Sequence, residues 1–87
     1  MGFRFSGGPM GKGGSPNVGD VIVKKEAHIT LVQRRKANGR DETTAHEKRP
    51  EYGVAKASRL ACEGRVAVWL TDDGVNFELL DNYRANS

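Results

Sequence analysis

The chain has 87 residues, which allows one small domain and excludes a two-domain enzyme, a (β/α)8 barrel and a complete dinucleotide-binding fold. With 37% hydrophobic and 29% charged residues, it is polar but able to fold, and its formal net charge is +3. The single cysteine, Cys62, excludes an internal disulfide framework and a Cys-rich zinc site. It suits a reducing compartment, so we expect a cytoplasmic protein. No apolar run is long enough to span a membrane, and no membrane partner is expected.

The distribution of glycine and proline predicts a tail followed by one domain. Residues 1–17 are rich in both and show neither the period of a strand nor that of a helix, so we expect a flexible tail there. A single α+β domain is expected over residues 18–83. Residues 84–87 are expected to form a frayed C-terminus.

Two β-branched stretches predict the first part of the sheet. They are Val21–Val23 and residues 27–33. The two stretches form either separate strands or one strand with a kink near Lys25 and Glu26.

The pair Asn38 and Gly39 favours a two-residue type I′ hairpin turn, in which both residues take positive φ. Such a turn would join residues 28–36 and 40–46 as antiparallel strands. It would also set opposite charges face to face, which stabilises a pair of strands. The facing pairs would be Lys36 with Asp41 and Arg35 with Glu42.

A helix is predicted after the hairpin. Pro50 suits the first helical turn, Glu51 suits the positive end of the helix dipole, and Gly64 suits the position just beyond the last turn. The apolar residues between them recur at helical spacing. They are Val54, Ala57, Leu60 and Ala61.

Two further strands complete the expected fold. Residues 65–71 and 75–79 read as strands around the turn Asp72–Asp73–Gly74. The order is then ββαββ, with one helix packed on one face of an antiparallel sheet of four or five strands. Trp69 would lie on the opposite, open face. The expected core consists of Ile29, Leu31, Val54, Ala57, Leu60, Ala61, Val66, Val68, Leu70, Phe77 and Leu79.

From His28 to Tyr83 the pattern resembles the DUF2188 family of small bacterial domains. The resemblance rests on the Asn38–Gly39 hairpin, the helix around residues 55–61, the strand Val66–Trp69 and the Asp73–Gly74 turn. It covers about two thirds of the chain and implies a fold without an activity. Element order is also similar in some small phage inhibitors, including certain anti-CRISPR proteins.

No arrangement of residues predicts catalysis or metal binding. His28 and His46 lack a third ligand. Cys62 lies in the last helical turn, where the dipole does not favour a thiolate. Asp72 and Asp73 are typical turn formers. We therefore expect no enzyme activity, no catalytic residue, no metal, no cofactor and no small-molecule substrate.

A cluster of cations marks the hairpin as one candidate surface. It consists of Arg34, Arg35, Lys36 and Arg40. A β-ribbon that carries arginine can follow a phosphate backbone. Nucleic-acid binding through residues 33–40 and the basic N-terminal tail is therefore one hypothesis.

A protein partner is the preferred hypothesis. Aromatic residues make up only 7% of the chain, which disfavours a sheet that stacks bases, and the acids that follow the turn would neutralise hairpin cations. We expect a small adaptor or inhibitor, and edge strands would also permit a homodimer. Because interfaces concentrate binding energy in Trp, Tyr and Arg, the aromatic anchors would be Trp69, Tyr52 and Tyr83.

Overall fold

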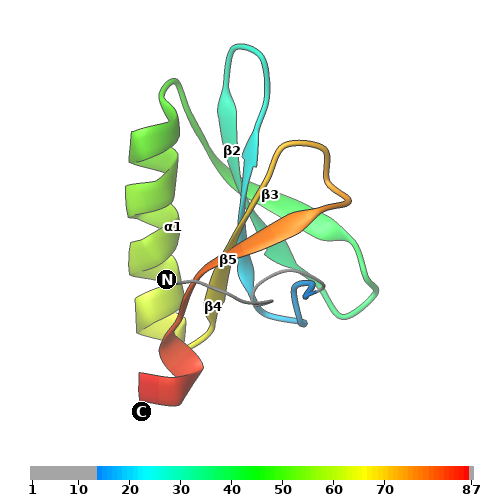
Figure 1. The fold of residues 1–87 in the computed structure, drawn as a ribbon, viewed down its shortest axis with the longest axis vertical. Helices are drawn as coiled ribbons and strands as arrows, with labels where there is room; N and C mark the ends of the chain where they lie inside the picture. The colour runs from blue at the N-terminus through cyan, green and yellow to red at the C-terminus, as the bar shows by residue number, and fades with distance from the viewer. Residues whose placement is uncertain (1–13, 87) are drawn as a thin grey trace, which may run out of the picture.

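The computed structural model of the chain describes residues 14–86. It is an α+β fold in which one helix lies against one face of a five-stranded sheet (Figure 1). The elements in chain order are β1 (Val21–Lys25), β2 (Thr30–Arg35), β3 (Asp41–Glu47), α1 (Pro50–Gly64), β4 (Ala67–Thr71), β5 (Phe77–Asn82) and the 3-10 helix η1 (Tyr83–Asn86). Most of the expected tail lies outside the described residues.

The sheet is mixed, so the prediction of a purely antiparallel sheet is wrong. Its strand order is β3-β2-β1-β4-β5, and β1 runs parallel to β4 with Val21 opposite Val68. β1, β2 and β3 form an antiparallel meander, after which α1 carries the chain back along the sheet before β4 begins. A crossover of this kind makes the following strand parallel. Three strands precede the helix instead of two, so the element order is βββαββ and the additional strand is β1.

The hairpin between β2 and β3 is confirmed, but its turn differs from the predicted one. The amide of Gly39 donates to the carbonyl of Lys36 at 2.9 Å, and the amide of Lys36 donates to the carbonyl of Arg40 at 2.7 Å. Within this loop, Gly39 has a positive φ, 84°, and Asn38 does not. The loop therefore has three residues, with glycine in the left-handed position.

This loop shifts the register by one residue near the turn. Arg35 faces Asp41 instead of Glu42, and a bulge between Val32 and Gln33 then restores the predicted alignment farther along. Lys36 forms its ion pair with Glu42. Opposite charges still meet in the hairpin, but with exchanged partners.

The main core lies between α1 and the sheet. It consists of Val21, Val23, Val32, Ala57, Ala61 and Val68, with Val54, Leu60, Val66 and Leu70 partly buried against it. Small residues on α1 let the helix approach the sheet closely. At Gly53 the approach is closest, because a Cβ atom there would lie 2.5 Å from Cγ2 of Thr30.

The opposite face of the sheet holds a smaller apolar cluster. It contains Ile22, Ala67 and Trp69, with Phe77 and Leu79 packed against them. Trp69 lies on the expected side of the sheet, but only 7% of its surface is exposed. This face is therefore covered at Trp69 instead of open.

Candidate functional site

Two of the four hairpin cations form ion pairs with acids of β3. Arg35 forms an ion pair with Asp41, and its guanidinium carbon lies 5.8 Å from the centre of the Phe77 ring. Lys36 forms an ion pair with Glu42 at 3.1 Å. Both cations are thus neutralised by β3.

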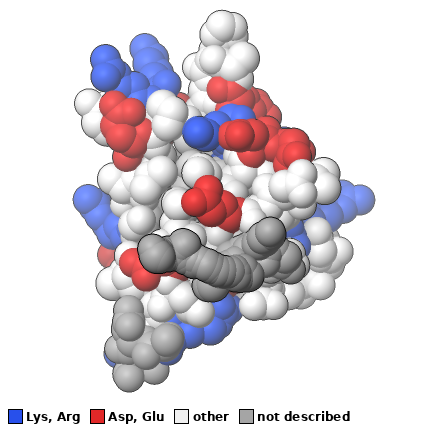
Figure 2. Space-filling model, viewed as in Figure 1, with Lys and Arg blue, Asp and Glu red and all other residues white. Residues whose placement is uncertain are grey.

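The other two hairpin cations are separate from each other. Arg34 faces Glu42 across the strands, and Arg40 is exposed beside the loop. Neither forms an ion pair among residues 14–86. Figure 2 shows Lys and Arg in separate groups around the rim of the visible face, with Asp and Glu between them. The charge on this face is mixed.

Of the three expected aromatic anchors, Trp69 is buried and Tyr83 is partly buried against the main core. The indole Nε1 of Trp69 donates to Asp20 at 2.9 Å. Tyr83 packs against the main core, and its amide donates to the carbonyl of Val66. Desolvation, followed by the negative charge of Asp81, raises the pKa of Tyr83. Both rings therefore help to hold the structure together.

Tyr52, the third expected anchor, lies in the open. It is 57% exposed in the first turns of α1. Lys56 and Arg59 follow it at the i+4 and i+7 positions, which places the three side chains along one side of the helix. We call these three residues the helix stripe.

A groove runs between α1 and β3, next to the helix stripe. It has a volume of about 240 Å³ and is lined by Thr44, Ala45, Lys56, Arg59 and Leu60. Ala45 and Leu60 are partly buried against the main core, so they supply its apolar lining. Lys56 and Arg59 place positive charge along it. We call this feature the β3–α1 groove.

β3 is an edge strand of the sheet formed by residues 14–86, because it pairs there with β2 alone. Backbone N–H and C=O groups alternate in direction along a strand, so an edge strand presents unpaired groups to a further strand. The acids of β3 have partners: Asp41 with Arg35, Glu42 with Lys36 and Glu47 with Lys56. The stretch between them, residues 43–46, carries no carboxylate.

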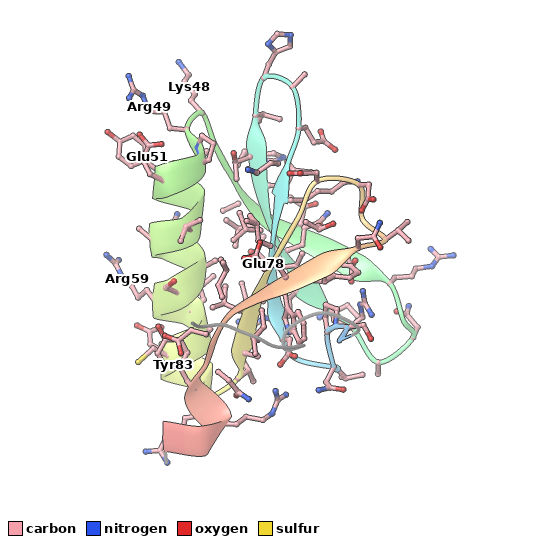
Figure 3. All side chains as sticks on the ribbon, viewed as in Figure 1. Lys48, Arg49, Glu51, Arg59, Glu78 and Tyr83 are labelled. Carbon is pink, nitrogen blue, oxygen red and sulfur yellow. The ribbon has the colours of Figure 1, made fainter. Side chains whose placement is uncertain are left out.

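More positive charge lies at the start of α1. Figure 3 shows Lys48 above the first turn, Arg49 and Glu51 together at the first turn, and Arg59 farther along on the left of the helix. Arg49 forms an exposed ion pair with Glu51 at 3.4 Å. Lys48 and Arg59 therefore supply positive charge near the groove, whereas Arg49 is paired with an acid.

The remaining polar clusters have structural explanations. Asp73 accepts backbone hydrogen bonds from Val75 and Asn76 at 2.8 Å each, and these bonds hold the pKa of its carboxyl well below the ordinary value. Within residues 14–86 no group of three or more His, Cys, Asp and Glu side chains could hold a metal ion. The described part of the chain also contains no helix with the length and apolarity that a membrane span requires.

Sequence reasoning named Tyr52 but missed the groove beside the helix stripe. The spacing of Tyr52, Lys56 and Arg59 was visible in the sequence as a polar helix side. Nothing local indicated that Thr44 and Ala45 lie beside it, because this depends on β3 being at the edge of the sheet.

A comparison of the chain with protein-family models, with curated proteins and with solved structures finds no match. The resemblance to the DUF2188 family therefore stays a prediction.

Proposed function

We propose that this protein is a small, non-enzymatic binding protein that acts as an adaptor or inhibitor by contacting another protein. The observation that carries the proposal is the β3–α1 groove, where an apolar lining, an open strand edge and the helix stripe come together. Tyrosine and arginine contribute most to binding energy at protein interfaces, and Tyr52 and Arg59 are both exposed here.

The charge distribution supports a protein partner over nucleic acid. A phosphate backbone is bound by several cations that each neutralise a phosphate. On the hairpin, Arg35 and Lys36 are already paired with acids, and Arg34 and Arg40 form no ion pair within residues 14–86. We therefore place the binding surface at the β3–α1 groove instead of the hairpin.

Charge reversal at two arginines tests this function. Immobilised wild-type protein, Arg59→Glu and Arg40→Glu are used to capture proteins from an extract of the cells that make the protein, with and without nuclease. Both arginines are exposed and undergo the same charge change, so Arg40→Glu is the matched control. We expect a captured protein that is retained by Arg40→Glu, weakened by roughly tenfold with Arg59→Glu and insensitive to nuclease.

Two results would overturn the proposal. Capture that depends on Arg40 but not on Arg59 would move the site to the hairpin. Capture that nuclease abolishes would favour the nucleic-acid hypothesis, and its affinity would then fall steeply with salt.

A further inference from the structure

We infer that the β3–α1 groove binds an extended, acidic segment of the partner protein, which adds to β3 as a further strand of the sheet. The inference rests on the proposed function and names the chemistry of the partner. In this mode of recognition the main chain provides hydrogen bonds and alternate side chains provide specificity.

The properties of β3 favour strand addition. Exposed edges are commonly protected by proline, by very short strands, by charged side chains such as lysine, or by a bulge. β3 has seven residues, contains neither proline nor lysine, and carries a bulge at Thr44. Asp41 and Glu42 are paired with Arg35 and Lys36, and residues 43–46 carry no carboxylate, so a second chain can reach this stretch without charge repulsion at its centre.

The groove favours acidic side chains at two positions of the segment. Residues two and four positions apart in an added strand face the same side, at about 6.6 and 13 Å, so two acids that flank an apolar residue would both face α1, where Lys56 and Arg59 line the groove. An arginine can hold a carboxylate through two parallel hydrogen bonds. Lys56 is bonded to Glu47 only loosely, at 3.7 Å, so it can serve a second carboxylate. Lys48 lies above the first turn of the same helix (Figure 3).

The lining of the groove favours an apolar residue between the two acids. Ala45 is small and leaves space above it, and Leu60 provides the facing apolar surface. An apolar side chain of the segment would cover both. The recognised pattern is therefore acid–x–apolar–x–acid in an extended conformation.

The opposite edge of the sheet does not fit this partner. β5 carries Glu78 and Asp81, and both are exposed. An acidic segment would be repelled there. β5 therefore provides an internal control for binding at a strand edge.

The test uses a series of acetylated, amidated heptapeptides, Thr-Glu-Thr-X-Thr-Glu-Thr, in which X is Val, Leu, Ile or Phe. Binding to the full chain is followed by NMR through backbone amide shifts and hydrogen exchange. We expect saturable shifts and slower exchange at residues 43–46, with a Kd of roughly 10–500 μM for the best member. The same peptide with both Glu residues replaced by Lys should bind at least about tenfold more weakly.

Two further variants distinguish strand addition from simple charge attraction. A peptide with proline at X keeps both carboxylates but loses a backbone donor and should bind at least about tenfold more weakly. The protein variant Arg59→Glu should reverse the preference, so that the Lys peptide binds better than the Glu peptide. Arg40→Glu should leave the preference unchanged, and the amide spectra of both variants report whether they are folded.

The inference would be overturned by shifts confined to β5 or to the hairpin loop, by equal binding of the proline peptide, or by no binding of any member at about 2 mM. It would also be overturned by shifts at β3 that grow with protein concentration alone, which would make the occupant a second copy. If the peptides fail but capture still depends on Arg59, strand addition is wrong and the protein-binding function stands. If capture of the partner protein does not depend on Arg59 either, strand addition and the proposed protein-binding function are both wrong.

Discussion

The indole Nε1 of Trp69 donates a 2.9 Å hydrogen bond to Oδ2 of Asp20, and both side chains are buried. The same carboxylate accepts from the amides of Asn17 and Ala67 and forms an ion pair with Arg84 at 2.7 Å. Asp20 therefore links the segment before β1 to β4 and to the C-terminal 3-10 helix. A buried carboxylate is costly unless its oxygens are satisfied, and here three N–H groups and a guanidinium satisfy them.

Replacing Asp20 should destabilise the fold, because several buried groups depend on its carboxylate. We expect Asp20→Ala to lower the free energy of unfolding by about 3 kcal/mol, because it leaves buried N–H groups without an acceptor. Asp20→Asn keeps one acceptor oxygen and should cost about 1–2 kcal/mol. Urea unfolding followed by circular dichroism measures both. If Asp20→Ala stays within 0.5 kcal/mol or so of the wild type, in the range of a surface substitution, the carboxylate is not an anchor of the fold.

Gly53→Ala tests the close approach between α1 and β2. Alanine is favoured over glycine in a helix by about 1 kcal/mol, but here its Cβ would lie 2.5 Å from Cγ2 of buried Thr30. We expect a net loss of about 1–3 kcal/mol in the free energy of unfolding, because the crowded atoms belong to a packed, β-branched side chain.

Gly64→Ala is the matched control for that prediction. Gly64 is also in α1, and the nearest atom to a Cβ there would be Cγ2 of Val66, at an ordinary contact distance of 3.8 Å. This change should leave stability unchanged or raise it by up to about 1 kcal/mol. The double variant Gly53→Ala with Thr30→Ser removes the clashing methyl group and should recover part of the loss. If the changes in the free energy of unfolding for Gly53→Ala and Thr30→Ser simply add in the double variant, there is no direct clash between the two side chains.

Elements carried by local signals were predictable from the sequence. Pro50 marked the start of α1, and the β2–β3 hairpin followed from Asn38 and Gly39. The end of the helix was missed by one residue: Gly64 is still helical, and Arg65 takes the left-handed conformation with φ 56°. The backbone there is set by hydrogen bonds of the cap to the carbonyls of Ala61 and Cys62, which the identity of one residue does not fix.

Long-range relationships were not predictable in this way. The place of β1 between β2 and β4 depends on how the whole chain closes. A signal was present, because three consecutive apolar residues, Val21–Val23, are typical of a central strand buried on both faces. No local pattern, however, indicated that Asp20 would meet Trp69 across 49 positions.

The Asp73 turn predicts a dependence of stability on pH. Backbone N–H donors at Asn76 and Val75 hold the folded-state pKa of Asp73 well below its ordinary value of 3.8. Because its pKa is lower in the folded state, Asp73 binds fewer protons in the folded state than in the unfolded state when the solution is acidic. The ionised carboxylate therefore stabilises the fold above about pH 4, and this stabilisation is lost as the pH falls. Asp73→Asn should therefore be less stable than the wild type at pH 7, and the difference should shrink toward pH 2.

Thermal unfolding of both proteins from pH 7 to pH 2 measures this difference. Asp72→Asn is the control, because Asp72 is its exposed neighbour and has only a loose contact with Lys25 at 3.8 Å. Exposed pairs of this kind contribute little, so Asp72→Asn should follow the wild type at every pH. A constant difference between Asp73→Asn and the wild type down to pH 2 would show that the turn is not stabilised by the carboxylate charge.

The hairpin loop allows a test of its turn type by two single substitutions. In a type I′ turn both Asn38 and Gly39 would need positive φ, and alanine would be strained at either position. In the three-residue loop only Gly39 has positive φ, and Asn38 contributes a hydrogen bond from the amide of Arg40 to its side-chain oxygen at 2.9 Å. Gly39→Ala should therefore cost about 1–2 kcal/mol, whereas Asn38→Ala should cost about 0.5 kcal/mol, the value of one exposed hydrogen bond. Equal costs in urea unfolding would instead support the two-residue turn.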